Sequence, residues 1–352
     1  EPEIDSKEIE GYTELLDLDE TQVALADDLL VTYQAEVATL QEELREVFDA
    51  ARQEFRETRD PSIWMDLGTA MEPFRERKER LNQGFLDDMR LVLSAEQDEN
   101  WDDAMRMRRR MRTMNDGLLS GESVDLIATV QELDLPVDTE ETVRPVLRQY
   151  ELELDRALVE RNKKYEEGQS EGMRLWQQQD FDEIERLFDD AREAAVAVRD
   201  INRRFARQIG SMLEGESAEE FQREFRERSF PTVYRETYAD RAMNTVEQFE
   251  DLTPDQQTEM EQIRASFARE FAALASKQET AIEEREMTRT ARDMFGWGRR
   301  GGRGGDGEMG ELRDERRELE ERTVERIRRV LDEDQASRLP ERPSRDWRRR
   351  DA

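Results

Sequence analysis

The side chains that carry most enzyme chemistry are missing from this chain. It has no histidine and no cysteine in 352 residues, which excludes imidazole catalysis, thiolate nucleophiles, disulfides and nearly all zinc or copper sites. Asp and Glu are abundant, but a catalytic carboxylate must be desolvated and must converge with a partner. Here the carboxylates mostly follow the polar faces of amphipathic segments, and no phosphate-binding loop, EF-hand loop or nucleophile elbow is present. We expect no enzyme, no cofactor and no metal site.

Net charge narrows the choice of partners. Lys and Arg number 55 against 88 Asp and Glu, a formal net charge of −33. A field of that sign repels nucleic acid and anionic membrane surfaces, and it attracts basic or partly unfolded proteins. The longest apolar run, Ala194 to Val198, is far shorter than a membrane span. We expect neither nucleic-acid binding nor membrane insertion, with protein clients or other subunits of an assembly as partners.

One segment combines adaptable apolar side chains with arginines. Met is frequent at promiscuous binding surfaces, and Arg adds hydrogen-bond donors and stacking planes. A client-binding surface is one interpretation, and the alternative is that Ala104 and three of the methionines form the buried stripe of a helix. The predicted client-binding residues, with the aromatic residues found at similar places, are Trp101, Met105, Arg106, Met107, Arg109, Met111, Met114, Phe221 and Phe225.

A run rich in glycine and arginine lies at 296–310. It resembles the Arg-Gly segments that bind nucleic acid. However, it holds few arginines and one nearby aromatic, Trp297, within a strongly acidic protein. We therefore predict the flexible tip of a helical hairpin.

A short pattern recurs along the chain: Leu, then Ser, Thr or Asp, then two residues, then Gln. Ser, Thr and Asp are good helix N-caps, and Gln three residues later completes a capping box. The pattern therefore predicts helix starts. Its complete copies comprise Leu18, Asp19 and Gln22; Leu93, Ser94 and Gln97; Leu252, Thr253 and Gln256; and Leu331, Asp332 and Gln335.

The spacing of these copies indicates an internal repeat. Counting two degenerate copies that lack Gln, those that open a unit begin at positions 18, 135 and 252, always 117 residues apart. Those that close a unit begin at 93, 213 and 331, at intervals of 120 and 118 residues. We infer three tandem units of about 117 residues, spanning 10–118, 119–232 and 233–347.

Each unit is expected to be a long α-helical hairpin, opened and closed by a capping-box motif. Apolar residues at helical spacing follow the first opener until Arg59-Asp60-Pro61 breaks the helix. The chain then returns to the closer, and a short last helix follows. In the repeat at 119–232 we expect the first helix to end near Gly168 to Gly172. In the repeat at 233–347 we expect the hairpin to turn at 296–310. The fold class is all-α.

A Leu-[Ser/Thr]-x-x-Gln motif that opens a long helical hairpin, with a second copy opening its last helix, resembles the LTxxQ proteins of the Spy/CpxP type. Leu252-Thr253-Pro254-Asp255-Gln256 matches that signature, and Leu93-Ser94-Ala95-Glu96-Gln97, followed by Trp101, is similar to the second motif with its trailing aromatic. The resemblance covers nearly the whole chain, three times over. It implies all-α periplasmic proteins that dimerise into a curved cradle and act as ATP-independent chaperones or envelope-stress regulators, some of which bind zinc.

The chain departs from that family in three ways. It fuses three units, which could replace dimerisation by internal packing and leave a monomer. It lacks His and Cys, which puts zinc binding in doubt, and it is acidic where the resemblance implies a basic face. Any basic face would be local, for example around Arg106 to Arg112.

These observations favour two functions. The first is an ATP-independent protein-binding module or holdase of the cell envelope, periplasmic or secreted, since the chain starts at Glu1 without an initiator Met and a removed signal peptide is expected. The second is a structural or scaffold subunit of a larger assembly without chaperone activity. An enzyme would require buried, convergent carboxylates in a closed pocket.

Overall fold

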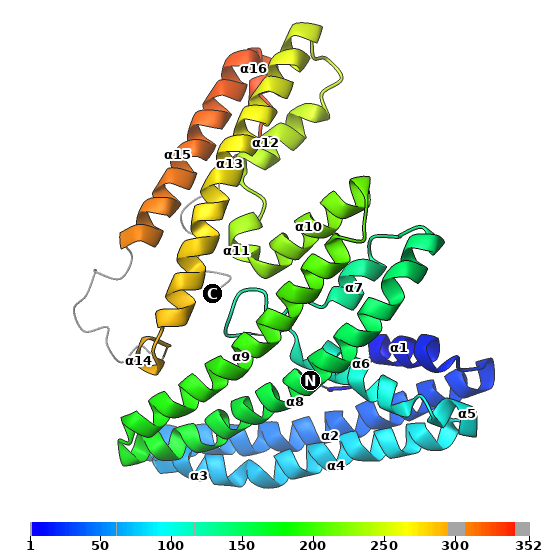
Figure 1. Ribbon diagram of the computed structural model, residues 1–352. Helices are drawn as coiled ribbons and strands as arrows, with labels where there is room; N and C mark the ends of the chain where they lie inside the picture. Colours follow the sequence, from blue (N-terminus) through cyan, green and yellow to red (C-terminus); the bar gives the residue numbers. More distant parts are fainter. Residues whose placement is uncertain (1, 61, 116, 295–306, 342–352) are drawn as a thin grey trace. The chain divides into compact units, whose positions relative to one another are not determined.

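The computed structural model describes residues 2–60, 62–115, 117–294 and 307–341. These residues form sixteen helices and no strand, which confirms the all-α prediction (Figure 1). The chain divides into two compact units, residues 1–112 and 113–352, so the predicted boundary at 232/233 falls inside the second unit. Most of the Gly/Arg-rich segment lies outside the described residues, and its last four residues, 307–310, begin a helix.

The first unit is a long two-helix hairpin with short helices at its open end. Helices α2 and α4 lie side by side (Figure 1). The helices are α1 (Ser6–Leu16), α2 (Glu20–Thr58), α3 (Ser62–Ala70), α4 (Glu72–Val92), α5 (Ala95–Asp98) and α6 (Trp101–Thr113). Helix α2 begins at an Asp19 capping box and ends where Arg59 takes a left-handed φ of 58°. That conformation, with Pro61 two residues later, stops the helix as the sequence predicts.

The core of the first unit is gathered at the open end of its hairpin. Helix α1 packs on α2 there, and α6 closes the cluster. Its fully or almost fully buried members are Ile4, Ile9, Tyr12, Leu16, Leu18, Ala26, Leu30, Tyr33, Val37, Phe85, Met89, Trp101, Ala104 and Met107. The far end of the hairpin has a smaller cluster of its own, built on Ala51, Ile63 and Leu67.

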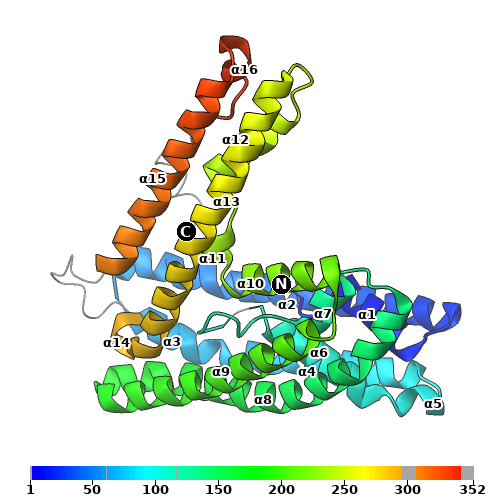
Figure 2. The ribbon, with the colours of Figure 1, turned by 45° about the horizontal axis from the view of Figure 1, so that its top comes forward.

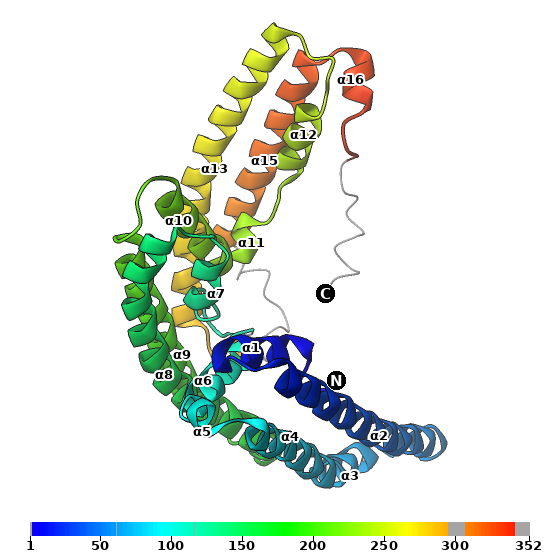
Figure 3. The ribbon, with the colours of Figure 1, turned by 90° about the vertical axis from the view of Figure 1, so that its right-hand side faces the viewer.

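The second unit contains two further long hairpins. Helices α8 and α9 form one, and α13 and α15 form the other (Figures 1 and 2). The helices are α7 (Leu126–Gln131), α8 (Val137–Gln178), α9 (Phe181–Gly210), α10 (Gly215–Ser229), α11 (Pro231–Tyr234), α12 (Tyr238–Glu247), α13 (Pro254–Thr288), α14 (Ala291–Met294), α15 (Gly307–Val330) and α16 (Glu333–Ser337). Helix α12 lies against α15, as Figure 3 shows.

The prediction that the first helix of the middle hairpin ends near Gly168 to Gly172 is wrong. Helix α8 continues through both glycines to Gln178. A glycine inside a helix costs only about 1 kcal/mol relative to alanine, and the packing of α8 along α9 outweighs that cost. The turn comes at Gln179, whose φ of 58° is left-handed, and the Asp180 side chain caps α9 by accepting from Glu183 N–H.

Candidate functional site

At the open end of the first hairpin, two glutamine side chains hydrogen-bond to each other. The Gln22 side-chain oxygen accepts the Asp19 N–H, which completes the capping box and turns the amide nitrogen outward. That nitrogen donates to Gln97 Oε1 at 2.7 Å, and Gln97 Nε2 donates back to Gln22 Oε1 at 2.9 Å. Because each amide uses both its donor and its acceptor, the pair joins the opening motif to the closing motif across the hairpin.

The same two amides satisfy backbone carbonyls at helix ends. Gln22 Nε2 also donates to the carbonyl of Val92, the last residue of α4, at 2.9 Å. Gln97 Nε2 donates to the carbonyl of Asp17, which ends α1, at 3.0 Å. The last carbonyls of a helix lack partners within the helix, so the Gln pair ties four chain segments together. We call this arrangement the amide clamp.

The third hairpin has the same clamp. Gln256 Nε2 donates to Gln335 Oε1 at 2.8 Å and to the carbonyl of Val330, the last residue of α15, at 2.9 Å. Gln335 Nε2 donates to the carbonyl of Asp251 at 3.0 Å. Thr253 and the closing Asp332, like Asp19 and Ser94 in the first hairpin, each form a complete capping box.

The middle hairpin has no glutamine where the clamp would form. Thr139 and Ser217 stand at those positions. The residues at its two helix starts, Pro136 and Glu214, make no side-chain capping bond. The clamp therefore accompanies the complete motif and is lost with the degenerate one.

Two hairpins carry a buried tyrosine–asparagine pair on their inner faces. The Tyr33 hydroxyl donates to Asn82 Oδ1 at 2.8 Å, and the Tyr150 hydroxyl contacts Asn202 Oδ1 at 3.0 Å. Sequence reasoning missed this pair as a polar feature. The signal was present, because the tyrosines are 117 residues apart and the asparagines 120, the intervals of the motif itself.

Each pair binds the irregular segment that precedes its own hairpin. In the first unit Asn82 Nδ2 donates to the Glu3 carboxylate, and Tyr33 Oη accepts the Glu3 N–H at 3.0 Å. In the middle hairpin Asn202 Nδ2 donates to the carbonyls of Gly121 and Glu122 at 2.9 and 3.0 Å. Backbone is therefore bound by the Tyr33 hydroxyl in the first hairpin and by the Asn202 amide in the middle hairpin.

A buried ion pair fastens the connector at 113–125 to the middle hairpin. Arg161 Nη1 donates to Glu122 Oε1 at 2.9 Å, and both side chains are at most 1% exposed. Glu122 also accepts the Tyr165 hydroxyl at 2.8 Å and the N–H groups of Leu118 and Leu119. Burial, followed by the neighbouring Glu122 charge, raises the pKa of Tyr165, so its hydroxyl remains a donor.

The residues predicted to bind clients lie largely in the core. Trp101, Met107, Met114 and Phe221 are each at most 7% exposed, and Trp101 packs on Tyr12 with ring centroids 6.0 Å apart. Met105, Met111 and Phe225 are partly buried against the same clusters. On α6, Trp101, Ala104 and Met107 lie on the buried face, whereas Met114, Phe221 and Phe225 pack in the core of residues 113–352.

The arginines of α6 are held by acidic side chains of the same unit instead of forming an open basic face. Arg106 pairs with Asp103, Arg108 with Glu8 at 2.8 Å, and Arg112 with Glu3. Arg109 is only partly exposed and also has an interaction within the fold. The local basic face expected around Arg106 to Arg112 is therefore turned inward.

The pKa values of two carboxyl groups at this site are shifted in opposite directions. Burial raises the pKa of Glu8, and this outweighs the hydrogen bond from Tyr12 and the charge of Arg108. Burial also opposes ionisation of Glu3, but the Lys78 hydrogen bond and the Arg112 charge outweigh it and lower its pKa. The two acids share one cluster of arginines, so their difference reflects how deeply each is buried.

Large apolar side chains on the described surface are scattered over several helices. They are Leu25, Val31, Leu91, Val137, Leu152, Val159, Trp176 and Met287. The recorded depressions are shallow and open, and one of about 280 Å³ lies between Phe181 and Thr290. This surface offers broad helix faces for contact with another chain.

The described residues contain neither a metal-binding cluster of acidic side chains nor a membrane-spanning helix. Across 2–60, 62–115, 117–294 and 307–341, no group of three or more acidic side chains is placed to hold a metal ion. No helix in those ranges combines the length and the apolar character needed to cross a bilayer. The comparisons with protein-family models, with curated proteins and with solved structures each found no match for this chain.

Proposed function

We propose that the chain is an array of three tandem helical hairpins that binds other proteins without ATP, as a holdase-type chaperone of the cell envelope. The amide clamp carries the proposal. It links an opening motif to a closing motif in the first hairpin and again in the third, and in both it also binds backbone carbonyls at corresponding positions. A resemblance to LTxxQ proteins implies one motif that opens a hairpin and a second that opens its last helix, and the clamp supports reading the two motifs as parts of one architectural unit.

Hairpins of this kind suit contact with non-native chains. Their surface combines single exposed apolar residues with a dense field of charges, so it can contact many sequences weakly while the net charge of −33 keeps the complex in solution. The Tyr–Asn pairs also bind irregular backbone in cis. Such surfaces favour adaptable contacts over one deep pocket.

The test is suppression of aggregation of a chemically unfolded client, without ATP, across a salt series. Suppression near one chaperone per client is expected for several unrelated clients. If suppression falls as salt is added, charge attracts the client; if suppression persists at high salt, apolar contact binds the client. Light scattering that matches a client-only control at every salt concentration would remove the holdase function.

A scaffold role is the second candidate, because ion pairs join α9 and α10 to α13 of the third hairpin. Arg203 pairs with Glu283 at 2.5 Å and Arg226 with Glu279 at 3.0 Å. Ion pairs of that kind between helical repeats can also form from one chain to the next. Concentration-dependent growth in light scattering, abolished by Arg203→Glu, would favour the scaffold, and a monodisperse monomer at high concentration would exclude it.

A further inference from the structure

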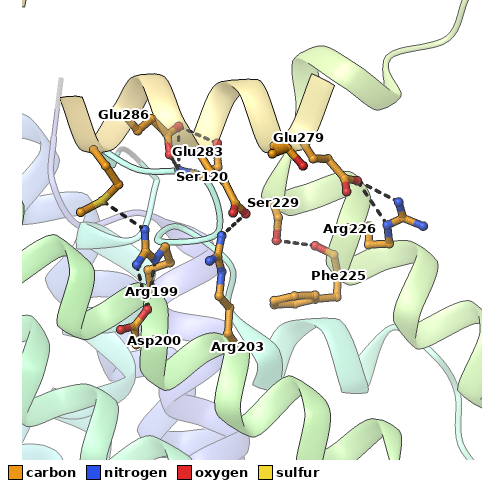
Figure 4. A network of polar contacts seen from close by, with 12 residues as sticks. Ser120, Arg199, Asp200, Arg203, Phe225, Arg226, Ser229, Glu279, Glu283 and Glu286 are labelled. Atoms are coloured by element: carbon orange, nitrogen blue, oxygen red, sulfur yellow. Dashed lines mark hydrogen bonds and ion pairs between the residues drawn. The ribbon is translucent and has the colours of Figure 1, made fainter. Parts of the chain in front are cut away.

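The C-terminal half of α13 is joined to α9 and α10 by a row of polar contacts (Figure 4). Glu279, Glu283 and Glu286 are four and three residues apart, so they share one helix face. Arg226 donates to Glu279 at 3.0 Å, and Arg203 donates to Glu283 at 2.5 Å. We call this row, with the contacts described next, the polar ladder.

The ladder continues towards the turn of the middle hairpin. The Ser120 N–H and hydroxyl donate to Glu286 at 3.0 and 2.6 Å. Arg192 Nη1 donates to the carbonyl of Arg289 at 2.6 Å. Between Glu283 and Arg289 the contacts move back along α9 from Arg203 to Arg192, so this segment runs antiparallel to α9.

The ladder covers a small apolar surface at the turn of the middle hairpin. Ala291, which begins α14, is 1% exposed and packs on Leu175 and Ile184, with Phe181, Leu187 and Phe188 around them. The Ala291 N–H donates to Glu185 at 3.1 Å. An open depression of about 280 Å³ borders this contact beside Phe181. Lifting α14 would expose a cluster of aromatic and aliphatic side chains.

The other end of the same interface is apolar. Phe230 and Val233 pack on Ala275, which is fully buried, and Phe271 and Ile282 border the contact. Apolar contact is insensitive to ionic screening, whereas the ladder is partly solvated, with Arg203 25% and Glu283 38% exposed. A partly exposed ion pair shifts an equilibrium by at most about fivefold. The ladder is therefore the part of the interface that salt can weaken, and screening leaves the Phe230–Ala275 contact in place as a pivot.

We propose that the polar ladder is a reversible latch that controls access to the apolar surface around Leu175, Ile184 and Phe188. When the latch is closed, α14 occupies this surface. When it opens, the third hairpin pivots about the Phe230–Ala275 contact and the surface accepts an unfolded segment with apolar side chains. This inference rests on the proposed holdase function, which it extends by naming the surface and its control.

Opening of the latch can be measured as a distance between two dyes. Because the chain has no cysteine, two introduced cysteines would be the only sites that the dyes label. A donor and an acceptor dye on Q178C and E284C, both exposed positions on α8 and α13, report opening by energy transfer. Between about 0.05 and 1 M salt, screening should weaken the ladder and lower transfer. At low salt, Arg203→Glu should raise the ratio of open to closed molecules about tenfold, and the swapped pair R203E/E283R should restore transfer.

Arg207→Glu is the matched control. It makes the same charge change on α9 at an exposed arginine outside the ladder, and transfer should stay at the wild-type value. Opening by R203E should also increase binding of the dye ANS and suppression of client aggregation. Energy transfer that ignores both salt and R203E, or that responds equally to R207E, would overturn the latch.

The same experiment separates the latch from the holdase. If R203E lowers transfer and raises ANS binding while no variant suppresses aggregation, the proposed function fails and the latch remains as a conformational device. If aggregation is suppressed equally by closed and open variants, the holdase stands and the claim that the latch controls it fails.

Discussion

Gln22 and Gln97 hydrogen-bond reciprocally through their side-chain amides at 2.7 and 2.9 Å, although 75 residues separate them in the chain. Each glutamine also completes the capping box of its own helix. One residue type at one spacing therefore serves two purposes, because the oxygen acts locally and the nitrogen acts across the hairpin. The clamp gives the motif a reason for Gln at its last position where Glu would serve the cap alone.

Removing one member of the clamp should destabilise the first unit selectively. Gln22→Leu leaves the Gln97 amide and the Val92 carbonyl without their partner, which should cost about 1–2 kcal/mol. A double-mutant cycle with Gln97→Leu should show a coupling of about 1 kcal/mol. Urea unfolding followed by hydrogen exchange would locate the loss in residues 1–112.

Gln53→Leu is the surface control for the clamp. Gln53 is exposed and bonds only to Glu57 one turn along the same helix, so its replacement should change stability by less than about 0.5 kcal/mol. Equal effects of Q22L and Q53L would show that the clamp contributes nothing beyond a surface hydrogen bond.

Breaking the buried ion pair should have a larger effect than breaking an exposed one. Arg161→Met leaves the buried Glu122 side chain without its partner, which should cost about 3–5 kcal/mol. Arg174→Met on the same helix removes an exposed pair with Glu171 and should cost less than about 1 kcal/mol. Thermal unfolding of the two variants side by side measures the difference, and a loss of similar size in both would contradict the assignment.

The stability of the first unit should depend on pH partly through Glu8. Since burial raises its folded pKa above the ordinary 4.5, the folded state holds this proton more tightly than the unfolded chain. The stabilising contribution is complete below pH 4.5 and is lost as pH rises through the raised folded value. Relative to Glu8→Gln, the wild type should lose stability across that window, as measured by urea unfolding at a series of pH values.

Glu3 provides the control of opposite sign. Its folded pKa is lowered, so its contribution is present above pH 4.5 and is lost as pH falls through the folded value. Relative to Glu3→Gln, the wild type should lose stability on acidification. If the stability of both variants changes with pH in the same way as that of the wild type, then neither the Glu8 nor the Glu3 pKa shift contributes to folding.

Residues 1–112 should fold without the rest of the chain. Their main core draws every member from between Ile4 and Met107, and they form a compact unit. A fragment of these residues should be helical by circular dichroism and should unfold cooperatively on heating. A fragment with little helix, or one that melts without a transition, would contradict this independence.

Local features of this fold could be predicted from the sequence, and features that depend on distant residues could not. Asp19, Ser94, Thr253 and Asp332 begin helices because a capping box involves only residues three positions apart. The end of α8 was misjudged because two glycines lower helix propensity slightly, while packing along α9 decides the outcome.

The predicted binding residues show the same limit. The spacing of Met107 and Met114 fits both a buried stripe and a binding face, and nothing within the segment distinguishes them. The packing of Trp101 against Tyr12, 89 positions earlier, places the segment in the core. A helix face is buried only when another surface covers it, so the pattern of one amphipathic helix cannot show whether that face is buried.

By itself, the sequence determined the all-α class, the starts of the helices that follow a complete motif and the period of that motif, because hydrogen bonding and amphipathicity act within one or two turns. Only the tertiary structure decided that amides of Gln22 and Gln97 meet, that Arg161 is buried with Glu122, and that Arg203 faces Glu283. Those contacts join residues 39 to 80 positions apart. Their formation depends on how whole helices pack, and the same charged residues on an isolated helix would simply face water.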